Sequence, residues 1–330
     1  MADHDLFLEI MADQIEWLKN CQVYSPGNRA HGVLCLDPGK NRAVPYFSNF
    51  AALALLEDPS AYAFVERYLD WYILNLEENG TMRDYYFEED LRVKTARPDS
   101  EDAYAGTFLF LVGRYLKKTS RASWLTVNLD RLKKIARVIT SLQCRDGLTF
   151  ARADHRVKYL MDNCEAYRGL SDFAELLARI GDPEARFFRL RAKMIASGIE
   201  RELWDLHRIS YRPQKKCFFR SRTRWRVFYP DAACQVFPVL YGLVVPESAR
   251  GIRLYTELNL HHPDWVCRRP PDYPWMLLGY CACLCNDFSR ARAKALFSRE
   301  AYVLPRSDFW YCLEAAYLVL TCALLLAGTR

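Results

Sequence analysis

Apolar residues recur at intervals of three and four along almost the whole chain, and no long segment alternates between apolar and polar residues. Spacing near 3.6 is typical of amphipathic helices, whereas spacing of two is typical of half-buried strands. The pattern predicts an all-α protein, with helices at residues 4–21, 45–57, 59–79, 100–118, 121–143, 158–180, 183–205, 230–242, 247–262, 272–286, 288–300 and 308–327.

The connections between these helices alternate in length. Short connections at residues 58–59, 119–120, 181–183 and 286–287 join the helices in pairs. Six such hairpins predict an (α/α)6 toroid with an inner and an outer ring of helices. No Pro-, Gly- or Ser-rich linker interrupts the sequence, so we expect residues 1–330 to form one domain.

Several predicted inner helices begin with an acidic residue that precedes a glycine by seven positions. Seven residues are about two helical turns, so each acid and its glycine share one face. A glycine inside a helix costs ~1 kcal/mol relative to alanine, and its presence predicts that two backbones approach closely there. The pairs are Asp99 with Gly106, Asp162 with Gly169, and Asp272 with Gly279.

Two of these helix starts hold several acids each. Asp99, Glu101 and Asp102 crowd the first, and Asp162 and Glu165 crowd the second. Acids at a helix start can be ordinary caps and dipole partners. Like charges in a partly dry cleft would instead raise the pKa of one carboxyl and produce a general acid beside an ionised partner, the combination that glycoside hydrolysis requires.

Two short motifs carry a resemblance to a known superfamily. Ser100-Glu101-Asp102-Ala103-Tyr104 resembles the Ser-Glu helix start of family-eight glycoside hydrolases, and Asp162-Asn163 resembles the Asp-Asn helix start of unsaturated glucuronyl hydrolases. Both belong to the six-hairpin glycosidases, which the predicted architecture also resembles. The first resemblance implies Glu101 as general acid. The second implies Asp162 as the principal acid, with Asp99 or Asp102 as its partner on the preceding inner helix. We expect Glu101 or Asp102 as general acid and Asp162 as general base, with Glu165 and Asp99 tuning them.

A sugar ligand would be held by aromatic faces and by polar groups that recognise hydroxyls. Residues of these kinds occur near the predicted helix starts and in the long connection at residues 80–98. The candidates for substrate binding are Tyr46, Asn49, Asp84, Tyr104, Asn163, Asp231, Gln235, Asp272, Trp275 and Trp310.

The segment 208–226 contains eight Lys and Arg residues and no acid, in a chain of net charge +6. It is either a solvated loop or an electropositive arm that attracts an acidic polysaccharide. Arg222 and Trp225 are its candidates for ligand binding. Aromatic residues among the basic ones would also suit single-stranded nucleic acid, but no nucleic-acid-binding module is recognisable, so no such partner is expected.

The twelve cysteines and the lack of a signal peptide favour reduced thiols in the cytoplasm. Cys281, Cys283 and Cys285 alternate on a predicted helix and cannot converge on one ion, so no metal is expected. We also expect no organic cofactor, and no membrane span because Glu314 interrupts the apolar C-terminal run. The oligomeric state stays open.

The sequence therefore favours a glycoside hydrolase that acts on an oligosaccharide or polysaccharide, neutral or acidic. A first alternative is a glycan-binding protein of an exopolysaccharide pathway that has the same fold without turnover. A second is a terpenoid cyclase, because Asp99-Ser100-Glu101-Asp102 resembles the Asp-x-Asp-Asp proton donor of those enzymes.

Overall fold

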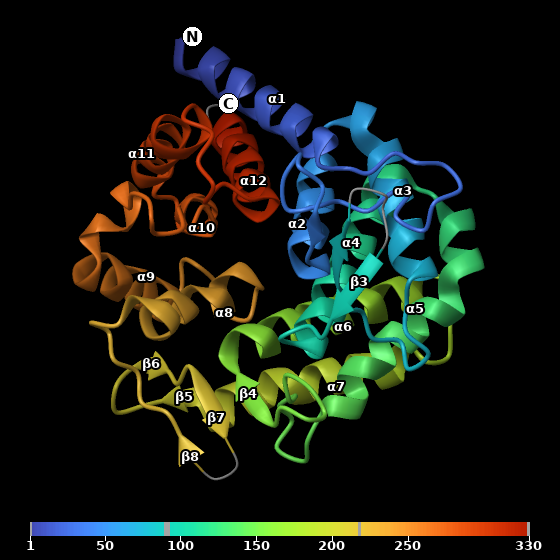
Figure 1. Cartoon of the computed structure of the whole chain (residues 1–330). Coiled ribbons are helices and arrows are strands. Elements are labelled where there is room, and N and C mark those ends of the chain that lie inside the picture. The colour runs from blue at the N-terminus through green and yellow to red at the C-terminus, as the bar shows by residue number, and fades with distance from the viewer. Residues whose placement is uncertain (1, 89–92, 217–218, 329–330) are drawn as a thin grey trace. The chain divides into compact units, whose positions relative to one another are not determined.

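The computed structural model describes residues 2–88, 93–216 and 219–328 (Figure 1). Within these ranges the helices are α1 (Ala2–Asn20), α2 (Pro45–Leu55), α3 (Tyr62–Leu74), α4 (Glu101–Thr119), α5 (Ala122–Leu142), α6 (Leu160–Arg179), α7 (Ala185–Gly198), α8 (Phe237–Leu240), α9 (Ala249–His261), α10 (Leu277–Leu284), α11 (Phe288–Ser298) and α12 (Cys312–Gly328). The short strands are β1 (Arg42–Ala43), β2 (Asp84–Phe87), β3 (Val93–Ala96), β4 (Val157–Tyr159), β5 (Trp204–Asp205), β6 (Ser210–Tyr211), β7 (Gln214–Lys216) and β8 (Phe219–Arg220).

Each predicted helix overlaps a helix of the structure, but some begin later than expected. The helix expected at residues 272–286 begins at Leu277, because Pro271 and Pro274 precede it and proline removes backbone donors and disfavours helical geometry before it. Asp272 and Trp275 therefore precede this helix, and Trp310 likewise precedes α12. The helix expected at residues 230–242 consists of short helical turns that end in α8.

The chain divides into two compact units. The terminal unit contains Met1–Leu74, Arg83–Ala96 and Pro263–Arg330, and the central unit contains Asn75–Met82 and Arg97–His262. The expectation of a single domain stays a prediction.

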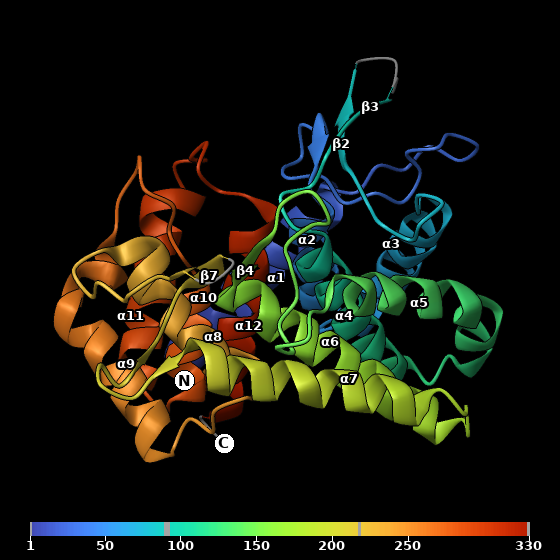
Figure 2. The same ribbon diagram turned by 90° about the horizontal axis from the view of Figure 1, so that it is seen from below.

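In the terminal unit, α12 packs against α1, α2 and α10, and α10 also packs against α11. The connection at residues 80–98 is not an irregular loop, because β2 pairs with both β1 and β3 in an antiparallel sheet. Figure 2 shows β2 and β3 side by side. Residues 89–92 of that connection lie outside the described part of the chain.

In the central unit, α6 packs against α4 on one side and α7 on the other (Figure 2). The glycine prediction is confirmed here: a Cβ on Gly106 would lie 2.7 Å from Glu165 O, and one on Gly169 would lie 2.7 Å from Gly106 Cα. Gly279 differs, because a Cβ there would meet only side-chain atoms, at 3.2–3.4 Å. The backbones of α4 and α6 therefore cross almost in contact.

The basic segment is also more structured than a loop. β7 pairs with β8 and with β4, and Tyr159 of β4 lies opposite Gln214 of β7. Because β4 leads directly into α6, this small sheet fixes where α6 begins. Residues 217–218 of the segment lie outside the described part of the chain.

Candidate functional site

The starts of α4 and α6 lie together because their crossing at Gly106 and Gly169 is within about two to three turns of both helix starts. Ser100, the residue before α4, has extended backbone geometry. Its Oγ lies 2.7 Å from Asp102 Oδ1 and 2.7 Å from Asp162 Oδ2. One serine hydroxyl thus joins two carboxyl groups from different helices.

A proton must be shared in this arrangement. A serine hydroxyl donates one hydrogen bond, so it can satisfy only one of two ionised carboxylates. The second close contact becomes a hydrogen bond when the other carboxyl is protonated and donates to Ser100 Oγ. The geometry therefore favours one proton on the pair of carboxyls, as in other closely spaced acids.

The electrostatics agree with this geometry. Burial raises the pKa of Asp102 to about 6, against hydrogen bonds from Thr149, Ser100 and Ala103 that lower it. Burial also raises the pKa of Asp162 well above its ordinary value, and the charge of Asp102 raises it further. Because the two groups are coupled, the pair titrates as a unit.

The two aspartates differ in accessibility. Asp102 is fully buried and accepts hydrogen bonds from Thr149 Oγ1 at 2.5 Å and from Ala103 N at 2.9 Å, in addition to Ser100. It cannot touch a substrate in this structure, which corrects its expected role as general acid. Asp162 is partly exposed, so it is the member of the pair that a ligand can reach.

Two tyrosines and a third aspartate interact electrostatically with Asp162. Burial, and after it the charges of Asp162 and Asp99, raise the pKa of both Tyr159 and Tyr229. Asp99 also raises the pKa of Asp162. Asp99 and Tyr229 are exposed and Tyr159 is partly exposed, so these groups form an accessible, electrostatically connected cluster.

The other acids at these helix starts, Glu101 and Glu165, have different neighbours. Glu101 is partly exposed, and its pKa is raised by burial and by Asp154 but lowered by Arg152. Glu165 is buried and accepts a hydrogen bond from Tyr241 at 3.1 Å. Asp162 therefore does not pair with Glu165 along its own helix. It pairs through Ser100 with Asp102 on the preceding inner helix, one of the two partners that the second resemblance implied.

Asn163, Tyr104 and Gln235 are buried, which corrects their expected roles in substrate binding. Asn163 Oδ1 accepts from Thr149 N at 2.8 Å and its Nδ2 donates to Tyr159 O at 2.8 Å. Gln235 forms two hydrogen bonds with the Tyr211 backbone, at 2.7 and 2.8 Å. These amides hold the site's supporting loops in place rather than face a ligand.

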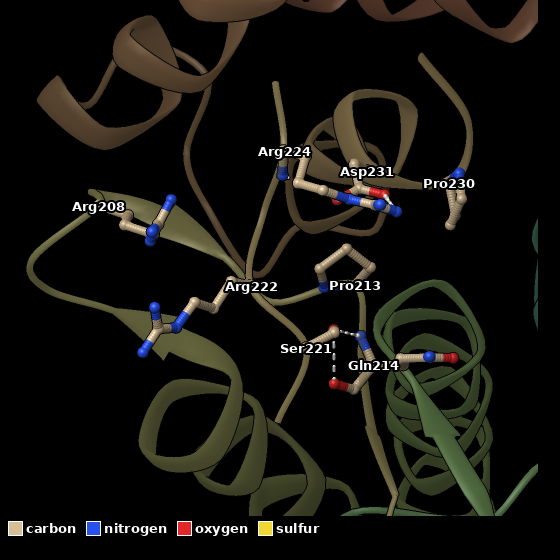
Figure 3. Close-up of a pocket in the computed structure, with 8 residues that line it drawn as sticks. All are labelled: Arg208, Pro213, Gln214, Ser221, Arg222, Arg224, Pro230 and Asp231. Carbon is tan, nitrogen blue, oxygen red and sulfur yellow. Dashed lines mark hydrogen bonds and ion pairs between the residues drawn. The ribbon is translucent and has the colours of Figure 1, made fainter. Parts of the chain in front are cut away.

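A pocket of about 420 Å³ adjoins the same small sheet (Figure 3). Arg222 is exposed and lines it, and buried Asp231 lines it while accepting a hydrogen bond from Arg224 N at 2.8 Å. Trp225 is partly exposed and stacks on His261, with ring centroids 5.8 Å apart. The residues that line the pocket are Arg208, Pro213, Gln214, Ser221, Arg222, Arg224, Pro230 and Asp231.

The candidates in the terminal unit are of two kinds. Asn49 is buried and its Oδ1 accepts a hydrogen bond from Tyr68 Oη at 2.8 Å. Trp310 is also buried and its Nε1 donates to Gln14 Oε1 at 2.9 Å. Both residues therefore stabilise the core. Asp84 is also buried, with its Oδ2 3.9 Å from Arg42 Nη2. The remaining candidates are accessible, and their roles stay predictions: Tyr46, Asp272 and Trp275.

Sequence reasoning missed Ser100, Thr149 and Tyr159 as parts of the site. Ser100 and Tyr159 each stand directly before a helix, a position that could have drawn attention to them. Thr149 lies in a connection and no local signal marks it. In the described ranges, no group of three or more His, Cys, Asp and Glu residues could hold a metal ion. None of the described helices is long and apolar enough to cross a membrane.

No protein-family model and no curated protein matches the sequence. Solved structures do match. The chain resembles a wild-type glycosidase with a TM-score of 0.71 and 11% identity, over 98% of each chain. It also resembles a rhamnosidase from Klebsiella oxytoca with rhamnose bound (TM-score 0.64, 13% identity), over 93% of this chain and 63% of the other.

A family GH78 rhamnosidase of Bacillus sp. GL1 is similar as well (TM-score 0.63, 14% identity), over 97% of this chain but only 34% of its own. At such low identity these similarities establish the fold. The expected fold class, an all-α (α/α)6 toroid, is confirmed.

Proposed function

We propose that this protein is a glycoside hydrolase in which Asp162 is the proton donor. The observation that carries the proposal is the pair of carboxyls bridged by Ser100, of which only Asp162 is accessible. A carboxyl whose pKa is raised by burial and by a neighbouring acid keeps its proton near neutral pH and can donate it. The similarity to solved glycosidases supports the class of reaction.

In the proposed reaction, Asp162 gives its proton to the glycosidic oxygen as the bond from the anomeric carbon to that oxygen breaks. Buried Asp102 is a positioning residue that keeps the proton on Asp162 through its negative charge. A water molecule adds to the anomeric carbon and loses a proton to a second carboxylate. Asp99 is our candidate for this carboxylate, because it is exposed and its charge acts on Asp162, Tyr159 and Tyr229.

The terpenoid cyclase alternative receives no support from the site. Such an enzyme needs an apolar cavity that is poor in charged groups, whereas three arginines and an aspartate line the pocket. The glycan-binding alternative is distinguished from the hydrolase by measuring product formation together with glycan binding, as described next.

The proposal is tested by incubating oligosaccharides from neutral and uronate-containing polysaccharides with the wild-type, Asp162→Asn and Glu101→Gln proteins. Mass spectrometry should detect products that have gained one water with the wild type and with Glu101→Gln, but not with Asp162→Asn. Equal product from Asp162→Asn would refute the assignment. Glycan binding without any product would identify a binding protein instead.

A further inference from the structure

The pocket described above carries positive charge that the described residues do not balance with ion pairs. Of the eight basic residues in the segment 208–226, four are paired with carboxylates. Arg212 Nη2 lies 2.7 Å from Asp205 Oδ2, and Lys215 Nζ lies 2.7 Å from Asp146 Oδ2. The other two pairs are Arg220 with Glu202 at 2.6 Å and Arg224 with Asp231 at 3.4 Å.

Two of the remaining four basic residues, Arg208 and Arg222, line the pocket. Within the described part of the chain, neither guanidinium group forms an ion pair, and that of Arg208 donates only to the Thr223 carbonyl, at 3.4 Å. Figure 3 shows their guanidinium groups together on one side of the pocket, away from the pair of Arg224 and Asp231. The three arginines and one aspartate leave the lining with a formal charge of +2 (3 − 1).

The pocket and the carboxyl pair share supporting elements. Gln214, in the pocket wall, lies opposite Tyr159 in the pairing of β7 with β4, and Asp162 follows Tyr159 by three residues. On another side, Pro230 of the pocket follows Tyr229, whose pKa is raised by burial and by the charge of Asp162. The pocket is therefore supported by the same small sheet that leads into α6, the helix that carries Asp162.

We propose that Arg208 and Arg222 bind an acidic group of the substrate, so that the substrate is an anionic oligosaccharide. This inference rests on the proposed function. A guanidinium group is planar and presents parallel N–H donors that match the two oxygens of a carboxylate. A uronate carboxylate is thus the best fit, and the pocket volume of about 420 Å³ is in the range of sites for small ligands. A sulfate ester shares this chemistry in part and is distinguished by the test.

Binding is measured by calorimetry in the Asp162→Asn background, where the ligand is not consumed. The probes are uronate-containing oligosaccharides, their carboxyl-reduced neutral counterparts, and O-sulfated neutral oligosaccharides. We expect at least a tenfold preference for uronate over its reduced counterpart, falling with added salt. Arg208→Gln and Arg222→Gln should each weaken uronate binding about tenfold and leave neutral binding unchanged. Arg226→Gln, which removes an exposed charge outside the pocket, is the matched control.

Each outcome bears on the proposal. Equal losses in Arg226→Gln and in the pocket variants would overturn it, because they would indicate a general charge effect. Absence of a preference for uronate, or absence of binding by every probe, would also overturn it. A preference for the sulfated probe over uronate would refute the carboxylate assignment. If binding depends on the pocket arginines but the wild type forms no product, the anion site stands and the hydrolase proposal fails.

Discussion

Each compact unit contains a pair of titratable groups whose pKa values are shifted by burial, and the two pairs differ in function. In the central unit, Asp102 and Asp162 are like-charged groups joined by Ser100. In the terminal unit, Lys294 of α11 and Glu314 of α12 are oppositely charged. Burial lowers the pKa of Lys294 to about 8 and raises that of Glu314 to about 7.

The two pairs differ in what satisfies their polar atoms. Lys294 is fully buried and donates to the carbonyls of Trp265 at 3.1 Å and Val266 at 3.3 Å. Glu314 is buried and accepts a hydrogen bond from Met276 N at 2.7 Å. The side chains of both residues therefore form hydrogen bonds with backbone groups of the protein itself. In the central unit, Asp162 is partly exposed and can meet a ligand.

The comparison teaches that a perturbed pKa does not by itself identify a functional site. Burial is the largest cause of the shift in all four groups. What distinguishes the Asp102 and Asp162 pair is access to one member and a like charge on the other, which together hold a transferable proton. We interpret the Lys294 and Glu314 pair as structural.

The largest expected effect is on turnover. Asp162→Asn should lower the rate of product formation by ~10³-fold, because the proton donor is lost. Lys294→Met should leave the rate per folded molecule unchanged. Initial rates on the same oligosaccharide, with the folded fraction measured by circular dichroism, check both variants. A large loss of turnover in folded Lys294→Met would break the distinction between the two pairs.

The next effect is on stability, where Lys294→Met should have a larger effect than Asp162→Asn. Lys294→Met should lower the free energy of unfolding by about 3 kcal/mol, because it leaves two buried carbonyls without a donor and removes the positive charge that acts on buried Glu314. Asp162→Asn should cost much less, since Asp162 is protonated near pH 7 and the neutral amide replaces a neutral carboxyl of similar shape that can still donate a hydrogen bond to Ser100. Urea denaturation of both variants at pH 7 measures the difference, and equal stabilities would contradict this prediction.

A smaller contrast concerns the glycines. Gly169→Ala should destabilise the protein by about 2 kcal/mol, because the new Cβ would overlap the backbone of Gly106. Gly279→Ala meets only side chains at 3.2 Å or more and gains helix propensity, so its effect should stay within about 1 kcal/mol. Thermal unfolding of the two variants compares them directly. Equal losses would show that the α4–α6 crossing is not unusually tight.

The smallest effect is on the pH profile. A general acid loses activity as pH rises through its pKa, so the alkaline limb of kcat/KM should report Asp162. Asp102→Asn removes the negative charge that raises this pKa and should move the limb to lower pH by about one unit. Asp102→Asn should also become relatively more stable as pH rises from 4 to 6, since the wild type loses stability where Asp102 must ionise. An unmoved limb would exclude coupling between the two acids.

Much of the helical fold was predictable because helical periodicity and short connections are local signals. The spacing of Asp162 and Gly169 predicted a close approach that the structure contains. The sequence left open which acids meet: the second resemblance implied Asp99 or Asp102 as the partner of Asp162, and the structure bridges Asp162 to Asp102 through Ser100, while Glu165 accepts a hydrogen bond from Tyr241. Thr149 escaped notice for the same reason, because its contact with Asp102 joins residues 47 positions apart.

The most direct test of the central claim is to measure the protonation of Asp162 itself. Carbon-13 NMR of protein labelled at the aspartate carboxyls, recorded from pH 3 to pH 9, follows each titration, and the Asp162→Asn spectrum assigns the missing signal. We predict that the Asp162 carboxyl titrates well above pH 4, and that Asp102 titrates near pH 6 and is coupled to it. An Asp162 signal that titrates near pH 4, unaffected by Asp102→Asn, would contradict the proton-donor assignment.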